Sequence, residues 1–345
     1  MAVSKAHVPQ LAIIHSRRNR LPAHYIRPIS DRPNLQEVLH ASDASVPLID
    51  LHGPDHVEIV REIGVACKTH GFFQVKNHGI PRQVIEDMLH VSKEFFGLPE
   101  SEKLKSYSDD PSKTARLSTS FNIKREKVSN WRDYLRLHCY PLEDFIEEWP
   151  TNPPSFRRVL GEYSTRARGL VLRLLEAISE SLGLEKDYIE KALGKQAQHM
   201  AINHYPRCPQ PELTYGLPGH TDPNALTLLL QDQVSGLQVL RDGKWVAVNP
   251  IPGTFVVNIG DQIQVLSNGR YKSALHRAVV NNSVERISIP TFYCPSQDAV
   301  IVPAEQLVAE DHPAMYRRFT YGEYYRRFWD HGLKTDSCID LFGAE

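Results

Sequence analysis

Residues 237–248 read LQVLRDGKWVAV, two mostly apolar stretches joined by Asp242-Gly243. Asp-Gly is a favoured turn for a two-residue β-hairpin, because both of its residues tolerate a positive φ. The short apolar runs on each side of the turn, Leu237–Leu240 and Trp245–Val248, are typical of β-strands bounded by turn residues. This segment therefore predicts an antiparallel hairpin, and it sets the fold class of the region around it.

Other short strands are predicted around this hairpin, each bounded by turn residues. They span 227–230, 237–240, 245–248, 254–258, 278–280 and 286–292. Asn268-Gly269 marks a further turn between two of them. Several short strands at this spacing are typical of a double-sheet jelly roll. We therefore expect a mixed α and β fold with a jelly-roll (double-stranded β-helix) core.

The N-terminal half has helical periodicity instead. Residues 54–70, 81–97 and 154–194 place apolar side chains three and four positions apart, with a turn permitted at Gly183. Residues 105–130 are polar and predict a long loop, a kind of segment that often carries binding residues. We expect the helices to pack against the jelly-roll core.

The end of the chain predicts a closing helix over residues 320–331. Thr320 and Glu323 have the spacing of a capping box. We expect three regions along the chain: a mainly helical region over 1–195, the jelly-roll core over 196–300, and an extension with this helix over 301–345.

The composition argues against several classes of protein. The chain has 345 residues and a formal net charge of −1, so no global field favours nucleic acid or an anionic membrane. No apolar run approaches the ~20 residues that a membrane span requires. The five cysteines are odd in number and lack C-x-x-C spacing, which disfavours a disulfide framework or structural zinc. We expect a monomeric cytoplasmic protein, with the nucleus as an alternative.

The first thirty residues contain no acidic side chain. Their basic residues are Lys5, Arg17, Arg18, Arg20 and Arg27. This composition is compatible with a transit peptide. We favour the alternative of an N-terminal helix that packs on the domain through Leu11, Ile13 and Ile14.

Two histidines and one carboxylate form the candidate metal site. His220 and Asp222 stand two positions apart, and on a strand they would face one cavity; His276 would join them from a distant strand. Such a set leaves one face of an octahedron free, which suits non-haem Fe(II) oxygenases. We predict these three residues as the metal ligands, with no catalytic residue beyond them. The alternatives are a packing role for His276 and a turn-capping role for Asp222.

Two further pairs have period-two spacing. Arg286 and Ser288 share one strand face, and an arginine fork with a hydroxyl suits a bound carboxylate. Asn203 and Tyr205 supply an amide and a phenol with the same spacing. The alternatives are a surface ion pair between Arg286 and Glu285, and a structural role for Tyr205.

Together these motifs resemble the core of the plant 2-oxoglutarate- and Fe(II)-dependent dioxygenases. They are N-x-Y-P at Asn203–Pro206, H-T-D at His220–Asp222, His276, and R-x-S at Arg286–Ser288. Val46–Leu51 and Gly71–Ile80 resemble the N-terminal signature of that family. The resemblance covers roughly residues 20 to 335, nearly the whole chain.

This resemblance implies Fe(II), the co-substrate 2-oxoglutarate and O2, with ascorbate in support. It implies that the far carboxylate of 2-oxoglutarate lies on Arg286 and Ser288, with a further bond from Tyr205. Asn203 is placed by the same resemblance near the metal-binding end of that molecule. His78 and His204 are not expected to bind metal, because His78 lies in a turn and His204 alternates with Asn203 and Tyr205.

Ser120–Asn122 and Asn130–Tyr134 resemble the subgroup of salicylate hydroxylases and flavone synthase I enzymes. The subgroup implies a salicylate 5- or 3-hydroxylase that acts in salicylate catabolism and plant defence control. Flavone synthase I or another flavanone-oxidising activity is the alternative. A silent module that binds a small aromatic ligand and a zinc hydrolase remain as further alternatives, although a hydrolase gives no role to Arg286 and Ser288.

The organic substrate is expected in a mostly apolar cavity. Phe292 falls six residues after Arg286, on the same strand face, where its ring could stack on an aromatic substrate. Arg116, Leu117 and Phe121 are expected to cover it, with Arg116 paired to an aromatic acid. The alternatives are a solvated Arg116, and a Leu117 and Phe121 that anchor their segment to the domain.

Overall fold

The computed structural model describes residues 11–15, 19–35, 38, 46–53, 55–123, 125–333 and 337–344. Lys5, Arg17 and Arg18 lie outside these residues, so the transit-peptide alternative remains a prediction. Among the described residues, no helix combines the length and apolar character that a bilayer crossing requires.

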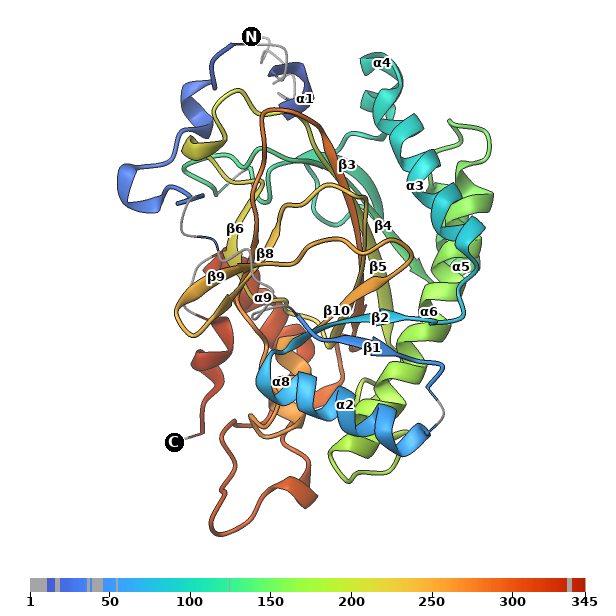
Figure 1. Cartoon of the computed structure of the whole chain (residues 1–345), viewed down its shortest axis with the longest axis vertical. Helices are drawn as coiled ribbons and strands as arrows, with labels where there is room; N and C mark the ends of the chain where they lie inside the picture. The colour runs from blue at the N-terminus through green and yellow to red at the C-terminus, as the bar shows by residue number, and fades with distance from the viewer. Residues whose placement is uncertain are drawn as a thin grey trace, which may run out of the picture.

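Two β-sheets form the core of the molecule and confirm the predicted jelly roll (Figure 1). The large sheet has the order β1 (Leu48–Asp50), β2 (Phe72–Lys76), β10 (Phe255–Ile259), β7 (Leu226–Gln231), β12 (Arg286–Cys294), β5 (Ala197–Tyr205), β4 (Asp133–Tyr140) and β3 (Ala115–Thr119). The small sheet has the order β6 (Leu217–His220), β11 (His276–Ala278), β8 (Leu237–Arg241) and β9 (Lys244–Ala247). A separate pair joins β13 (Val300–Ile301) and β14 (Phe319–Thr320).

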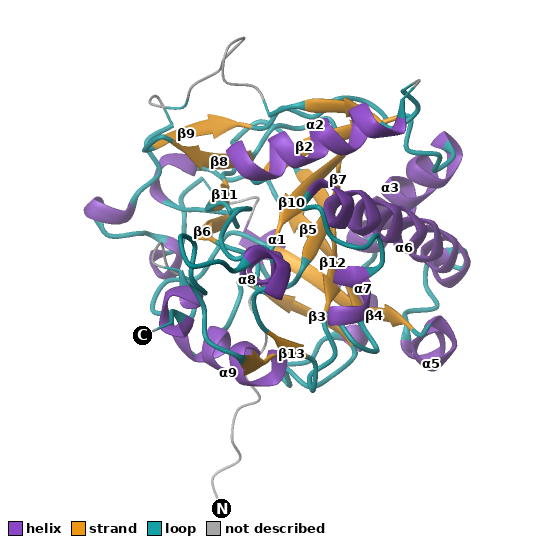
Figure 2. Cartoon of the chain, turned by 90° about the horizontal axis from the view of Figure 1, so that it is seen from below, coloured by secondary structure: helices purple, strands orange, loops and turns teal. Residues whose placement is uncertain are grey.

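Helices flank the large sheet, with α3 and α6 grouped on one side of the strands (Figure 2). The helices are α1 (Ala12–His15), α2 (His56–Thr69), α3 (Arg82–Gly97), α4 (Glu100–Lys103), α5 (Leu142–Phe145), α6 (Phe156–Ser181), α7 (Tyr188–Ala192), α8 (Asp261–Leu266) and α9 (Tyr321–His331). Because α2 and α3 both pack on α6, this long helix is the centre of the helical layer.

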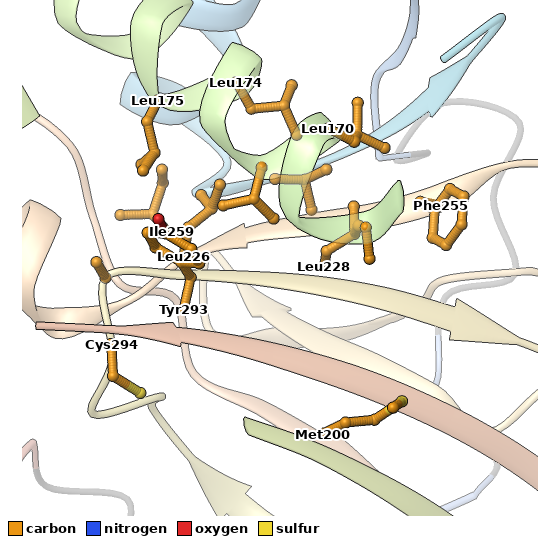
Figure 3. Close-up of a cluster of buried hydrophobic side chains, with 14 of the residues drawn as sticks. Leu170, Leu174, Leu175, Met200, Leu226, Leu228, Phe255, Ile259, Tyr293 and Cys294 are labelled. Atoms are coloured by element: carbon orange, nitrogen blue, oxygen red, sulfur yellow. The ribbon is translucent and has the colours of Figure 1, made fainter. Parts of the chain in front are cut away.

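Helix α6 buries its apolar stripe against the outer face of the large sheet. Leu170 and Leu174 are each 1% exposed and lie over Leu226 and Leu228 of β7 (Figure 3). A fully buried leucine contributes about 1.5–3 kcal/mol. This packing leaves the opposite face of the same strands free to line the interior between the two sheets.

The local signals for turns and helix ends are confirmed. Asp242 (φ 48°) and Gly243 (φ 74°) both adopt the left-handed conformation that the β8–β9 hairpin requires. Gly183 (φ 76°) separates α6 from α7. The Thr320 side chain accepts a hydrogen bond from the backbone N–H of Glu323 and so caps α9.

The prediction of a loop over residues 105–130 is wrong in part, because β3 lies inside it and pairs with β4. Arg116 and Ser118 occupy one face of β3 and gave the segment its polar character. Arg116 and Ser118 are nevertheless buried in the folded protein. Leu117, on the other face of β3, is fully buried in the main core. The N-terminal region thus contributes β1–β4 to the large sheet as well as helices.

The predicted N-terminal helix is short, and two of its three apolar contacts are made. Leu11 is 1% exposed in the main core, and Ile13 packs against the same cluster. Ile14 remains 39% exposed. The Asp133 carboxylate accepts the backbone N–H groups of Ala12 and Ile13 and so holds the first turn of α1.

Candidate active site

Three of the predicted residues meet at one point between the two sheets. His220, Asp222 and His276 each offer a ligand atom, and these atoms lie within 4.8 Å of one another. The Nε2 atoms of His220 and His276 lie 3.8 and 3.6 Å from Oδ1 of Asp222. His276 and His220 are register partners on β11 and β6, so the ladder of the small sheet sets their separation.

The outer nitrogen of each imidazole is already engaged. Nδ1 of His220 donates to the carbonyl of Pro218 at 2.8 Å, and Nδ1 of His276 donates to the carbonyl of Ala274 at 3.1 Å. A carbonyl only accepts, so each Nδ1 carries a proton, and in the neutral form of the ring Nε2 then presents a lone pair. Burial and the neighbouring His276 ring lower the pKa of His220 to about 3, which keeps its ring neutral. Neutral imidazoles held in this way suit a divalent metal ion.

Asp222 does not lie on the predicted strand, because β6 ends at His220 and Pro223 follows the aspartate. Its position depends instead on β7 and β10. Oδ2 accepts from the Thr227 hydroxyl at 2.6 Å and from the Asn258 amide at 2.8 Å, and Oδ1 faces the histidines. Burial acts to raise the pKa of Asp222, but the histidines and these two bonds outweigh it and lower the pKa. The carboxylate is thus anionic, and the alternative of a mere turn cap does not fit its convergence with both histidines.

An inner chamber of about 70 Å³ lies on one side of the three residues. Asn203, Tyr205, Arg286 and Ser288 all line it, so the structure brings together the two pairs that the sequence singled out. The register of β5 and β12 explains this, because Tyr205 is opposite Arg286 and Asn203 is opposite Ser288. Asp222 is the only acidic residue lining this chamber in the described part of the chain. The chamber therefore fits an anion that reaches from the arginine to the histidines.

Arg286 is 3% exposed and does not pair with Glu285, which bonds His204 instead. Its Nε donates to the Val234 carbonyl and one Nη to the Gln231 side chain, at 3.0 and 2.9 Å. These bonds hold the guanidinium with its plane fixed, about 5.2 Å from the centre of the Tyr205 ring. The surface ion pair considered for Arg286 is excluded by this geometry.

His204 points to the opposite face of β5, as alternation predicts. Its ring stacks on Phe96 at 4.8 Å, away from the inner chamber. His78 bonds the Gly253 carbonyl at 3.0 Å in the turn before α3. Neither histidine lies among the residues that could hold the metal.

An outer chamber of about 120 Å³ also reaches His220 and Asp222, whereas His276 lines only the inner chamber. It shares Arg132, Leu217, His220, Asp222 and Phe292 with the inner chamber. Its remaining wall is largely aromatic and comes from Phe121, Tyr134, Tyr321, Tyr325, Phe328 and Trp329. The candidate metal site therefore stands in the partition between two chambers, where one ligand from each side can approach it.

The predicted substrate residues divide into two groups. Arg116, Phe121 and Phe292 line the outer chamber, and Phe121 stacks on Trp329 at 4.8 Å. Leu117 lines neither chamber, because strand alternation turns it into the main core. Of the alternatives for Leu117, anchoring the segment to the domain is the one that the structure supports.

Several residues of the site carry no recognisable motif in the sequence. Gly216 and Gly236 allow close approach: a Cβ at Gly216 would lie 2.6 Å from the Tyr205 ring, and one at Gly236 would lie 2.9 Å from Cδ of Arg286. Arg136, Tyr325 and Trp329 were missed because their strand and helix are remote in sequence from the metal motif. The alternation of Arg132, Tyr134 and Arg136 was a usable signal for an inward-facing polar strand.

Two family descriptions match the chain. Residues 196–295 match the 2OG-Fe(II) oxygenase superfamily, and residues 46–155 match the N-terminal domain described as non-haem dioxygenase in morphine synthesis. The first match contains the three candidate metal ligands and both polar pairs.

Similar proteins extend over nearly the whole chain. Protein DMR6-LIKE OXYGENASE 2 of Arabidopsis thaliana is 61% identical, over 100% of this chain and 99% of that protein. Flavanone 3-dioxygenase 2 of Oryza sativa subsp. japonica is 58% identical, over 93% of this chain and 94% of that protein. The crystal structure of JOX2 in complex with 2OG, Fe and JA superimposes with a TM-score of 0.90 at 35% identity, covering 98% and 99% of the two chains.

Proposed function

The chain belongs to the 2OG-Fe(II) oxygenase superfamily and is a 2-oxoglutarate-dependent dioxygenase, and on this premise we propose that it hydroxylates a small aromatic acid. Salicylate, oxidised at its 5 or 3 position, is the first candidate. The observation that carries the proposal is the outer chamber, which is walled by aromatic rings and by Arg116, Arg132 and Arg136. Asp222 is the only acid on that wall among the described residues, so the chamber favours an anionic aromatic guest.

In this proposal His220, Asp222 and His276 hold Fe(II). Two neutral imidazoles and one carboxylate are the donor set of non-haem iron oxygenases, and their Nε2 and Oδ1 atoms converge. Thr227 and Asn258 orient the carboxylate, and the carbonyls of Pro218 and Ala274 orient the rings. When bound, Fe(II) with O2 and 2-oxoglutarate supplies the oxidising chemistry, and the chain supplies position.

The inner chamber is proposed to hold 2-oxoglutarate. Arg286 and Ser288 would bind its far carboxylate with a further bond from Tyr205, and Asn203 would lie nearer the metal. Nδ2 of Asn203 lies 3.4 Å from the Ser288 hydroxyl, so the two polar pairs face the same part of the chamber. Holding both reactants on either side of one metal ion would raise the reaction rate through proximity and orientation.

The test is an assay of the purified protein with Fe(II), 2-oxoglutarate and ascorbate. We expect salicylate loss to be matched by succinate release, and both to stop when 2-oxoglutarate is omitted. Ligand binding without succinate release would support a silent binding module instead. Turnover that continues without 2-oxoglutarate would support a hydrolase.

A flavanone is the second candidate substrate, because of the similarity to the rice flavanone 3-dioxygenase. The aromatic wall suits a flavanone as well as salicylate, but a neutral flavanone offers the arginines only uncharged carbonyl and hydroxyl oxygens and no opposite charge. Including naringenin in the same assay separates the two candidates. Turnover of naringenin alone would reverse our order of substrates.

A further inference from the structure

Two arginines lie directly opposite each other at the edge of the large sheet. Arg116 of β3 and Arg136 of β4 are register partners, and both side chains line the outer chamber. Like charges in such a cross-strand pair destabilise a sheet. Burial and, to a smaller extent, the charge of Arg116 lower the pKa of Arg136, so the two guanidinium groups do act on each other.

The described wall of the chamber offers this pair little negative charge. Asp222 is the only acid on the described wall, and it faces the two histidines. Outside the chamber, the charge of Asp110 reaches Arg136, and Asp109 lines a neighbouring surface pocket together with Arg116. The outer chamber thus has an excess of positive charge on its wall.

Both arginines also keep unused donors. Arg116 is 5% exposed and gives one Nη to the Tyr134 hydroxyl at 2.8 Å, while Arg136 gives one Nη to the carbonyls of Pro111 and Lys113. The Nε atoms of Arg116 and Arg136 are buried and have no hydrogen-bond partner. Leaving a buried donor unpaired is costly, so the pair is suited to a ligand that accepts hydrogen bonds.

Arg132, the third arginine of the chamber, has a hydrogen-bonded Nε, unlike Arg116 and Arg136. Its Nε and one Nη both donate to the Ser120 carbonyl, at 3.0 and 2.6 Å, and its guanidinium lies 4.5 Å from the centre of the Tyr134 ring. These contacts join the segment before β4 to the end of β3. We therefore give Arg132 a structural part and restrict the binding role to the other two arginines.

The neighbours of the pair leave room for a small aromatic ring. Ala201 of β5 is the register partner of Arg136 and lines the same chamber with only a methyl group. Phe292 and Tyr325 supply aromatic surface beside it. Arg116 lies on the edge strand β3 and Arg136 on its neighbour β4, whereas His220 lies on the small sheet. All three line the outer chamber, so a ligand whose acid group binds the arginines can extend its ring toward His220.

We infer that Arg116 and Arg136 form a two-guanidinium anchor that binds the carboxylate of the organic substrate and selects aromatic acids over neutral aromatic molecules. The inference rests on the proposed function, because it names the group of that substrate by which the enzyme holds it. A carboxylate accepts from both forks at once and offsets the repulsion between them.

The first test needs no variant. Calorimetry on the wild-type chain should find that salicylate binds at least ~10-fold more tightly than salicylamide, whose neutral amide has the same shape, because charge-assisted hydrogen bonds are the stronger ones. Equal affinities for the acid and the amide would overturn the anchor.

The second test compares Arg116→Gln and Arg136→Gln with Arg82→Gln, which removes one charge from an exposed helix position. We expect each chamber variant to weaken salicylate binding and raise its KM by roughly 10- to 100-fold, with the KM for 2-oxoglutarate unchanged. Salicylamide binding should not change in any variant. An unchanged salicylate KM in both chamber variants would refute the inference.

Thermal unfolding provides a readout for folding. Ligand-free Arg116→Gln should unfold at a temperature no lower than that of the wild type, because the substitution relieves the like-charge pair. Salicylate should raise the unfolding temperature of the wild type more than that of the variant. A purely structural arginine predicts the reverse: a lower unfolding temperature without ligand and an unchanged shift with it.

Failure of the proposed function has a different signature. If salicylate binds through the arginines but is not turned over, the proposed reaction fails and the anchor stands. If salicylate is turned over by both chamber variants with the wild-type KM, the anchor fails and the proposed reaction stands.

Discussion

At the scale of single residues, the candidate metal site is held in place by the protein itself. Each histidine bonds a carbonyl two positions earlier in its own chain, and Asp222 is bonded by Thr227 and Asn258. None of these bonds needs a metal ion. The three ligand atoms should therefore keep their convergence when the metal is removed, and loss of one ligand should affect catalysis more than folding.

Replacement of one histidine tests this statement. His276→Ala should lower iron-dependent turnover by more than about 100-fold, since even substitutions next to a metal site cost 10- to 100-fold. The change should leave circular dichroism largely as in the wild type. Turnover and spectra of His90→Ala, an exposed position of α3, provide the control. Wild-type turnover by His276→Ala would remove this residue from the ligand set.

Arg286 provides a second residue-scale prediction. Arg286→Lys should raise the KM for 2-oxoglutarate by roughly 10- to 100-fold, because a point charge replaces the bidentate fork. Its bonds to Val234 and Gln231 would also be lost. The KM for the aromatic substrate should change little, and Arg82→Lys is the matched control. An unchanged requirement for 2-oxoglutarate would place its far carboxylate elsewhere.

At the scale of secondary-structure elements, helix α9 forms one wall of the outer chamber. Tyr321, Tyr325, Phe328 and Trp329 face the chamber from it. The helix has only eleven residues, so its packing and its cap contribute more to its stability than intrinsic propensity does. The Thr320 cap is exposed and lies outside the chamber, which makes it a clean position for perturbing this wall.

We expect Thr320→Ala to lower the free energy of unfolding by about 1 kcal/mol, the usual cost of losing such a cap. The measurement is chemical denaturation of the purified protein. Thr320→Ser keeps the accepting hydroxyl oxygen and should retain most of the stability. If the Thr320→Ala and Thr320→Ser variants had the same free energy of unfolding, the bond to the Glu323 N–H would contribute nothing to stability.

The strands show where prediction from sequence succeeded and where it failed. The β8–β9 hairpin follows from Asp242-Gly243 alone, because a two-residue turn is a local event. Strand β3 was missed because Arg116 and Ser118 resemble loop residues until the strand pairing that buries them is known. Period-two spacing correctly grouped Arg286 with Ser288 and Phe292, but it wrongly placed Asp222 on a strand.

At the scale of the whole molecule, the two sheets make a protected interior that carries titratable groups. His138 and His199 stack at 4.1 Å in neighbouring strands, and His199 lines the outer chamber. Burial and the charge of Arg136 lower the pKa of His138 to about 4. Burial, followed by the effects of His138 and Arg136, lowers the pKa of His199 well below its usual value. Folding thus favours the neutral form of both rings.

The preference of the folded state for neutral His138 and His199 stabilises the fold at neutral pH relative to acidic pH. A histidine with a lowered folded-state pKa contributes stability above its unfolded value of about 6.5, and that contribution is lost as the pH falls toward about 4. The free energy of unfolding, measured by denaturation between pH 7 and 4, should therefore decrease on acidification. His138→Phe should reduce the slope, whereas His90→Phe at an exposed position should not. Equal slopes in wild type and His138→Phe would contradict the prediction.

The sequence by itself determined the kinds of chemical group that the site contains. Spacing of two along a strand requires no knowledge of distant residues, so the groupings of Arg286 with Ser288 and of Asn203 with Tyr205 followed from local geometry. Family resemblance then indicated iron and 2-oxoglutarate, and the similar proteins bear this out.

Only the tertiary structure decided which groups meet. His276 approaches His220 because β11 pairs with β6. Arg116 approaches Arg136 because β3 pairs with β4. The partition of the interior into two chambers likewise depends on how the sheets face each other. Such pairings join residues far apart in the chain, and their free energy comes from burial of whole faces, which local periodicity does not encode.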